Sequence, residues 1–324
     1  MPLSSMSSHM KNKTLVTEFV LLGFTEIRLV EISLFVIILS LYLLTLMGNL
    51  VIITITLIDQ RLQIPMYFFL RNLSLMEIGY SSIIIPKMLS KFLTGKGTIS
   101  LMACFTQCFL YFAVGTSGFF LLTVMSVDRY VAICHPLRYP IIMNRRVCIH
   151  LVTGSWICGF LIILWPSVLL FQLPFCGSNV INHFFCDSTA LIKLSCANTQ
   201  HLELMDFFTA IFTLLGTLSI TVVSYVNIIS TVSRIPSATG KQKAFSTCAS
   251  HIIMVSITYG TCIFLYLKPT RSIGLDFNKM AAIFNTILPP LLDPFIYSLR
   301  NKQVKEALKQ AVGRIVRCSK DSRM

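Results

Sequence analysis

The chain of 324 residues is 55% hydrophobic and only 12% charged, with a mean hydropathy of +0.75. A soluble domain carries about 25% charged residues, so this composition excludes an ordinary soluble protein and indicates a lipid environment. The net charge of +14 would suit a nucleic-acid-binding protein. However, eight of the basic residues follow Leu299, next to an apolar segment. A basic edge facing anionic lipid explains them better, and we expect no nucleic-acid partner.

Seven apolar segments are long enough to cross a bilayer, which requires about 20 residues each. They cover residues 30–58, 65–90, 100–133, 147–170, 203–233, 242–267 and 279–299. The sequence therefore predicts an all-α membrane protein, a seven-transmembrane helix bundle with a short cytoplasmic C-terminal amphipathic helix. We expect an extracellular N-terminal segment at 1–28, the bundle at 29–299 and a cytoplasmic tail at 300–324.

The orientation of the bundle rests on weak signals in the loops. With the N-terminus outside, 17 of the 27 Lys and Arg residues fall on the cytoplasmic side, but the tail supplies eight of them. Lys87, Lys91 and Lys96 fall on the outer side, against the expected charge bias. A glycosylation sequon at Asn12 favours an extracellular N-terminus. We therefore expect a multi-pass protein of the plasma membrane with its N-terminus outside.

Four of the 11 cysteines fall on the expected extracellular face. Cys104 begins the third span, and Cys176, Cys186 and Cys196 share the long loop before the fifth. Two disulfides in an oxidising compartment would fasten this loop over the bundle, although four cysteines allow three pairings. A metal site at His183, Cys186 and Asp187 is the alternative, but a disulfide would consume the thiol. We expect no metal.

Two carboxylates lie inside predicted spans, where ionisable groups are costly and usually functional. Glu77 in the second span and Asp293 in the seventh, with Asn49 in the first, are predicted to form one interior polar cluster. The cluster is either a switch, with a shared proton or a cation such as sodium, or a purely structural network. Pro294 frees a backbone carbonyl and can kink its helix, which suits a bistable element.

An Asp-Arg-Tyr triplet, Asp128-Arg129-Tyr130, ends the third span, where a helix meets water. Asp128 is expected to pair with Arg129 in a resting state, and release would free the guanidinium. An interfacial anchoring arginine is the alternative. No phosphate-binding glycine loop, zinc-protease motif, nucleophile elbow or inverted repeat is found, so neither an enzyme nor a transporter is expected.

Six motifs occur in order along the chain, and together they resemble those of vertebrate olfactory (odorant) receptors of the tetrapod-type class, within the rhodopsin-like G-protein-coupled receptors. The motifs are Gly48-Asn49, Pro65–Leu70, Ile85–Leu89, Ser126–Cys134, Lys243–His251 and Pro290–Asn301. The resemblance implies a receptor that binds odorants, needs no cofactor, and couples to a stimulatory olfactory G protein that raises cyclic AMP. It also implies disulfides Cys104–Cys186 and Cys176–Cys196.

The resemblance assigns roles to residues near the cytoplasmic ends of the spans. Arg129 would contact the G protein, Tyr297 would close the inner network, and the start of the sixth span would move on activation. The implied coupling and switch set is Asp128, Arg129, Tyr130, Tyr225, Lys243, Ser246, Thr247, His251, Asp293, Pro294 and Tyr297.

The chain also departs from the family pattern. Ser126-Val127 replaces the frequent Ala-Tyr, Glu77 replaces Asp, Asp293 replaces Asn, and Gly118 replaces a frequent Glu. The interior carboxylates are thus redistributed, which puts a cation site in doubt but leaves the expected fold unchanged.

A ligand pocket is expected between the helices, beneath the fastened loop. Helical spacing puts several residues of the third span on one face, which by family analogy points into the odorant cavity. The predicted lining is Cys108, Tyr111, Phe112, Gly115, Thr116, Thr209, Thr213, Tyr259, Cys262, Tyr266 and Thr286. Ordinary helix packing is the alternative for each. This lining favours small neutral volatile molecules. A non-olfactory rhodopsin-like receptor for another small ligand is the alternative function.

Overall fold

The computed structural model describes residues 16–24, 27–176, 178–266, 275–300, 303–310 and 313. Within these ranges, side chains are not described for residues 243, 244, 246, 247, 264–266, 275–278 and 298–300. The predicted sequon at Asn12 lies outside the described residues. The same holds for the side chains of Lys243, Ser246, Thr247 and Tyr266.

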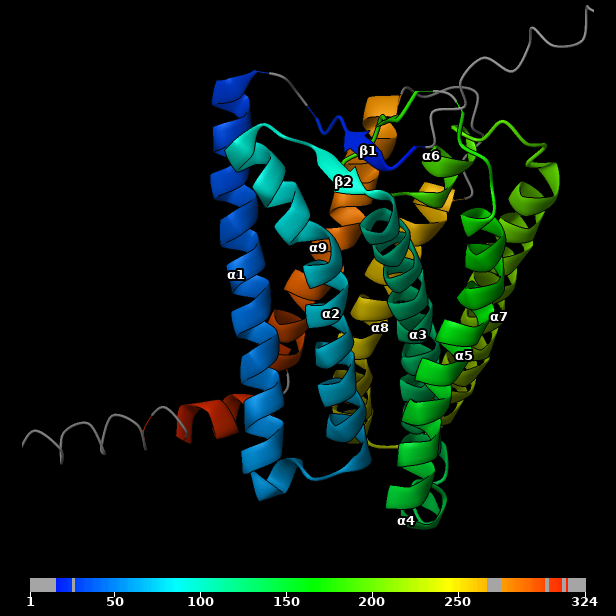
Figure 1. Cartoon of the computed structure of the whole chain (residues 1–324). Coiled ribbons are helices and arrows are strands. Elements are labelled where there is room, and N and C mark those ends of the chain that lie inside the picture. Colours follow the sequence, from blue (N-terminus) through cyan, green and yellow to red (C-terminus); the bar gives the residue numbers. More distant parts are fainter. Residues whose placement is uncertain are drawn as a thin grey trace, which may run out of the picture.

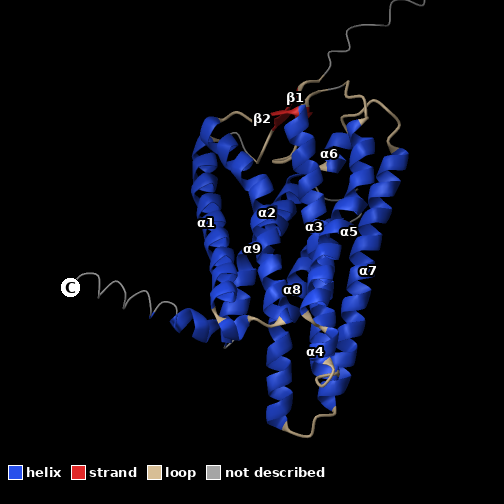
Figure 2. Ribbon diagram, turned by 60° about the horizontal axis from the view of Figure 1, so that its bottom comes forward, coloured by secondary structure: helices blue, strands red, loops and turns tan. Residues whose placement is uncertain are grey.

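Seven long helices run side by side and form a bundle (Figure 1). They are α1 (Arg28–Ile58), α2 (Pro65–Thr94), α3 (Leu101–Cys134), α5 (Arg145–Phe171), α7 (Gln200–Ser233), α8 (Ala238–Tyr266) and α9 (Leu275–Arg300). Each corresponds to one predicted segment, so the seven-helix bundle is confirmed. The helix α3 packs against α2, α5 and α7 and runs through the middle of the bundle in Figure 2.

Local sequence signals set several helix ends. Pro65 lies in the first turn of α2. An N–H group there has no intrahelical acceptor, so a proline at this position costs the helix no hydrogen bond. Gly95 ends that helix in a left-handed conformation with φ 71°, which few other residues adopt cheaply. Ser100 caps α3 by accepting from the Ala103 N–H at 3.3 Å, and Asn144 caps α5 by accepting from the Val147 N–H at 3.1 Å.

Among the described residues, five helical segments are long and apolar enough to cross a membrane. They are α1, α3, α5, α7 and residues 279–297 of α9. The helix α8 has a shorter apolar stretch, Cys248–Ile263. The helix α2 contains Arg71, Glu77, Lys87 and Lys91, which lower its hydropathy although it lies inside the bundle.

A small three-stranded sheet covers one end of the bundle and was not predicted. Its strands are β1 (Glu18–Leu21), β2 (Thr98–Ser100) and β3 (Val180–Ile181), in the order β2-β1-β3. The strand β1 pairs antiparallel with β2 and parallel with β3. The short elements η1 (Gln60–Leu62), α4 (Tyr139–Ile142) and α6 (Ser188–Ile192) complete the chain order. We call the sheet, α6 and the loop between α5 and α7 the lid, and name the two ends of the bundle the lid end and the Arg129 end.

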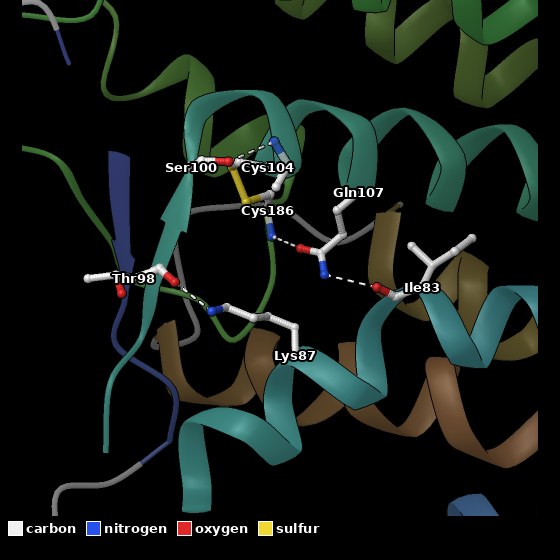
Figure 3. Close-up of a disulfide and its surroundings, with 8 residues drawn as sticks. Ile83, Lys87, Thr98, Ser100, Cys104, Gln107 and Cys186 are labelled. Atoms are coloured by element: carbon white, nitrogen blue, oxygen red, sulfur yellow. Dashed lines mark hydrogen bonds between the residues drawn. A yellow bond between two sulfur atoms is a disulfide. The ribbon is translucent and has the colours of Figure 1, made fainter. Parts of the chain in front are cut away.

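Two disulfides hold the lid. Cys104 at the start of α3 is bonded to Cys186, and Cys176 is bonded to Cys196. This is the pairing that the family resemblance implies. Beneath the first disulfide, Gln107 accepts from the Cys186 N–H at 3.1 Å and donates to the Ile83 carbonyl at 3.0 Å (Figure 3). One side chain therefore connects the loop to both α3 and α2.

Two of the three lysines that opposed the charge bias, Lys87 and Lys91, hold the lid end together, and Lys279 does the same. Lys87 donates to the Thr98 carbonyl of β2 at 2.5 Å (Figure 3). Lys91 pairs with the buried Glu31 of α1 at 3.3 Å. Lys279 of α9, itself buried, donates to the Gly23 carbonyl at 3.0 Å. These lysines are placed by specific partners, which explains why a simple count of charges between the two sides was uninformative.

His183 gives the lid an expected pH dependence. Its ring contacts Phe184 and Phe185 at centroid distances of 4.7 and 4.5 Å, and its Nδ1 is buried without a hydrogen-bond partner. Burial lowers the pKa of His183 below 6.5; Lys279 adds to this, and Asp187 opposes it. The unfolded lid therefore binds more protons in acid, and stability should fall as the pH drops below about 6.5.

The measurement is thermal unfolding of the purified receptor at about pH 7.5 and about pH 5.5. We expect a lower melting temperature in acid, and a smaller acid-induced drop in the variant His183→Gln, which cannot titrate. An equal drop in both proteins would show that His183 does not set the pH dependence.

Residues 303–310 form a short helix, as predicted for the segment after the bundle. Val304 and Ala307 are buried against the main core, whereas Lys305 and Lys309 are exposed. Tyr67 of α2 donates to Gln303 at 2.8 Å. The helix runs sideways from the Arg129 end, below α9 in Figure 1.

Candidate functional site

A buried ion pair dominates the Arg129 end. The Arg129 guanidinium donates through Nε (3.1 Å) and Nη2 to Oδ2 of Asp128. The other carboxylate oxygen accepts from the Tyr139 hydroxyl at 2.8 Å. Asp128 is fully buried and Arg129 is 6% exposed. A buried pair persists only when its polar atoms are hydrogen-bonded, and here both carboxylate oxygens are occupied.

Tyr139 was missed by the sequence analysis. It lies on α4, in the loop between α3 and α5, and is brought back onto Asp128 by the short helix. Burial, together with the negative charge of Asp128, raises the pKa of Tyr139 above its usual 10. The phenol therefore stays protonated and acts as a donor. The only signal in the sequence was a tyrosine within a basic loop.

A second polar pair lies beside Arg129 and joins α7 to α8. The Tyr225 hydroxyl lies 2.5 Å from His251 Nδ1, and the two rings stack at 5.8 Å. Both side chains are close enough to Arg129 to be affected by its charge. Ser126 of α3 donates to Thr221 of α7 at 3.3 Å. Arg129 is thus surrounded by contacts that join α3, α7 and α8.

Tyr130 lies apart from this cluster. Its hydroxyl is 3.2 Å from the His135 ring at an exposed position just after α3. The predicted coupling residues Asp128, Arg129, Tyr225 and His251 are therefore brought together, whereas Tyr130 belongs to the edge of the same end.

The interior polar cluster assembles around α9. Pro294 has no N–H to donate to the Pro290 carbonyl, and that carbonyl instead accepts from Asn49 at 3.0 Å. A side chain on Gly48 would meet Pro294, since a Cβ built there lies 2.9 Å from the proline Cβ. The Gly48-Asn49 motif therefore allows α1 to approach α9 and to bond the Pro290 carbonyl that Pro294 leaves free.

Glu77 and Asp293 line a cavity of about 80 Å³ together with Gly118. Glu77 Oε2, both oxygens of Asp293, Asn49 Oδ1 and the Tyr297 hydroxyl are buried without a hydrogen-bond partner. Buried oxygens of this kind need water, a shared proton or a cation. A cavity of this kind needs about 10–15 Å³ to hold one water molecule, so this one has room for several. Within the described ranges, no three His, Cys, Asp or Glu side chains are grouped to hold a metal ion.

The predicted ligand residues divide between several places. Gly115 and Cys262 line the cavity, and Tyr111 stacks at 4.7 Å on Tyr80, which also lines it. Cys108 and Phe112 pack under the lid. The others that can be placed are buried or half-buried in the helix interfaces, namely Thr116, Thr209, Thr213, Tyr259 and Thr286.

Asn285 of α9 is a cavity residue that the sequence analysis missed. It accepts from Thr261 at 2.9 Å, donates to the Tyr80 hydroxyl at 3.3 Å and lies 3.4 Å from the Cys262 sulfur. The lone amide in an otherwise apolar stretch was the available signal. The cavity can therefore offer a polar group to a small molecule between otherwise apolar walls.

Comparison with known proteins identifies the family. The family model for olfactory receptors matches residues 38–314. Olfactory receptor 6E1 of Mus musculus is 52% identical over 96% of this chain and 99% of its own length. Olfactory receptors 6C75 and 6X1 of Homo sapiens are 52% and 48% identical over 95% and 94% of this chain, and 98% and 97% of their own lengths. The chain therefore belongs to the olfactory receptor family of rhodopsin-like G-protein-coupled receptors, and it is a multi-pass odorant receptor rather than an enzyme.

Proposed function

We propose that this receptor lies in the plasma membrane with the lid outside, binds small neutral volatile odorants within the bundle, and activates a stimulatory olfactory-type G protein that raises cyclic AMP. The observation that carries the proposal is the buried Asp128–Arg129 pair, closed by Tyr139 at the end opposite the lid. A charged group at the membrane boundary is costly and usually functional. The Arg129 guanidinium is buried in the resting state, and release by a bound G protein would give it such a function.

Two features support the orientation. Disulfides form and persist in oxidising compartments, and both described disulfides belong to the lid. The tail after Leu299 carries eight basic residues, which suit the cytoplasmic leaflet. The N-terminal segment would then be extracellular, with Asn12 available for glycosylation.

The chemistry of the cavity supports a neutral ligand. Its walls are mostly apolar, with Thr258, Cys262 and Asn285 as uncharged polar groups. Glu77 and Asp293 also line it, and their unpaired oxygens, like those of Asn49 and Tyr297, suit a part in a switch rather than a ligand anchor. A cationic odorant would compete with that role, whereas a neutral one would not.

Activation would be a population shift. A ligand that binds the active arrangement more tightly than the resting one moves the equilibrium towards it. In the resting state Asp128 and Tyr139 hold Arg129. In the active state the guanidinium would turn towards the G protein while α8 moves at its Lys243, Ser246 and Thr247 end. Asp293, Pro294 and Tyr297 would form the hinge of α9.

Tyr139→Phe tests the restraint on Arg129. The change removes one hydrogen bond to a charged group, worth about 1.5 kcal/mol or more, without altering the ring. We expect odorant-independent cyclic AMP to rise about tenfold at matched surface level, because only the resting state loses the bond. Unaltered basal signalling would mean that Tyr139 does not restrain Arg129.

The choice of G protein is tested by genetic removal. Cells that lack stimulatory α subunits should give no cyclic AMP response to an activating odorant, and re-expression of the olfactory-type subunit should restore the response. A response that persists without these subunits would contradict the proposed coupling.

The place of the ligand is tested by filling the cavity. A Cβ at Gly118 meets no atom within 4 Å, and Gly118 lines the cavity. Gly118→Val should therefore raise the odorant concentration needed for half-maximal response. Gly260→Val is the matched control, since Gly260 has equally open surroundings and faces outward. Equal dose–response curves for both variants would exclude this cavity.

A further inference from the structure

The chain between α7 and α8 contains a short break, residues 234–237, at the Arg129 end of the bundle. The Cys134 sulfur, at the end of α3, lies 3.1 Å from the Thr231 hydroxyl just before the break. Pro236 disfavours helical geometry at the residue before it, so this segment does not continue α7. Three of its four residues are exposed. The break therefore presents accessible, non-helical chain beside the Arg129 cluster.

The charges around the break are all positive. No Asp or Glu occurs in the sequence between Asp206 and Asp276, whereas Arg234 and Lys241 are exposed on either side of Ser237. Arg234 stands three residues before this serine. Protein kinases select their substrates in part by charge pattern, and an acidic site on a kinase pairs well with an arginine at a fixed distance from the acceptor hydroxyl.

Ser237 differs from the two exposed hydroxyl groups near it. Ser233 belongs to the last turn of α7 and donates to the Ser230 carbonyl at 2.8 Å. Thr239 belongs to the first turn of α8. Of these three acceptors, only Ser237 lies outside a helix and has an arginine three residues before it. We propose that Ser237 is a phosphorylation site for a serine kinase that recognises this arginine.

The reaction is a phosphoryl transfer from ATP. The Ser237 Oγ forms a new bond to the γ-phosphorus, the bond between that phosphorus and the β-phosphate oxygen breaks, and ADP leaves. The hydroxyl proton passes to the catalytic base of the kinase. The receptor supplies only the acceptor hydroxyl and the arginine that positions it.

The phosphate would strengthen a cap that Ser237 already forms. Its Oγ accepts from the Gly240 N–H at 3.3 Å, and its carbonyl accepts from the Lys241 N–H at 3.0 Å. A phosphate adds a charge of about −1.5 to −2 at the start of α8, where the helix dipole and the free N–H groups favour an anion. Arg234 and Lys241 can pair with it from both sides. The start of α8 would then be held more firmly in the arrangement seen here.

This gives the modification a regulatory consequence, which rests on the proposed function. Activation as proposed requires the start of α8 to move, so a phosphate that holds it would reduce signalling. A kinase that is itself activated by cyclic AMP would make this a negative feedback on the receptor.

The site is tested on the purified full-length receptor in lipid nanodiscs. The receptor is incubated with ATP and the catalytic subunit of the cyclic-AMP-dependent kinase, and phosphate at Ser237 is quantified by mass spectrometry. We expect Arg234→Gln to lower the phosphate at Ser237 by about tenfold. Ser233→Ala is the matched control and should leave it unchanged. Absence of phosphate at Ser237, or equal phosphate in Arg234→Gln, would overturn the proposed site.

Hydrogen exchange tests the cap. The phosphorylated receptor is compared with the same sample after phosphatase treatment. Amide exchange at residues 238–241 should be about threefold slower with the phosphate in place. The start of α5, which Asn144 caps, is the control and should not change. Equal exchange at residues 238–241, or equal slowing at α5, would overturn the capping role.

The regulatory consequence is tested by Ser237→Asp against Ser237→Asn. Both residues cap a helix well, but only aspartate adds a negative charge. The maximal cyclic-AMP response to an activating odorant should fall about twofold or more in the Asp variant and stay near wild type in the Asn variant. Equal responses would overturn the regulation. The phosphorylation and exchange tests need neither odorant nor G protein, so their failure is distinct from failure of the proposed function.

Discussion

Cys104→Ser is expected to remove most of the receptor from the cell surface. The Cys104–Cys186 disulfide closes a chain separation of 82 residues, and both cysteines are fully buried under the lid. A cross-link over a loop of this length stabilises a fold by roughly 4 kcal/mol, chiefly by restricting the unfolded chain. Without the disulfide, the Cys186 N–H is no longer held in place, and Gln107 loses the hydrogen bond that it accepts from this group. The measurement is flow cytometry of an N-terminally tagged receptor.

Cys158→Ser is the control for this experiment, because Cys158 is a free cysteine at an exposed position on α5. It should leave the surface level near that of the wild type. Equal surface levels for Cys104→Ser and Cys158→Ser would show that the disulfide is dispensable for folding.

Asp128→Asn is expected to produce strong signalling without odorant. Asp128 neutralises Arg129 and accepts the Tyr139 bond in a fully buried setting. Breaking a buried pair by removing one partner costs about 3–5 kcal/mol. The substitution destabilises the resting state, and a destabilisation of about 1.4 kcal/mol is enough to raise the ratio of active to resting receptor tenfold. We expect basal cyclic AMP per surface receptor to rise at least about tenfold.

Two further variants separate release of Arg129 from general damage. Asp59→Asn disrupts an exposed pair with Arg61, where the oxygen–nitrogen distance is 2.6 Å, and should leave basal signalling unchanged. The double variant Asp128→Asn with Arg129→Ala should be silent, since the released group is gone. Basal signalling that persists in the double variant would exclude Arg129 as the effector.

The sequence predicted the bundle well because a membrane imposes a simple length rule. Each spanning helix must satisfy its own backbone and needs about 20 apolar residues, so the segments can be counted directly. The lid sheet could not be predicted in this way. Its strands β1, β2 and β3 have four, three and two residues, and they pair across large separations along the chain. No periodic pattern develops in so few residues.

The candidate site was predicted in part, and the limits have a physical cause. Helical spacing indicates which face of α3 points inward but not how deep a cavity lies. Gly115 therefore lines the cavity, while Cys108, on a nearby face two turns away, packs under the lid. Tyr139 and Asn285 act through contacts between separate elements, and single-sequence reasoning cannot establish such contacts.

A cyclic-AMP assay of odorant responses tests the central claim most directly. Cells expressing the receptor or its Arg129→Ala variant, matched for surface staining, are exposed to a chemically diverse panel of odorants. The account predicts a dose-dependent rise in cyclic AMP for at least one neutral odorant, and its loss in Arg129→Ala. A response of equal size in the variant would contradict the role of Arg129. Silence of a well-displayed receptor to every neutral volatile would contradict the proposed ligand class and coupling.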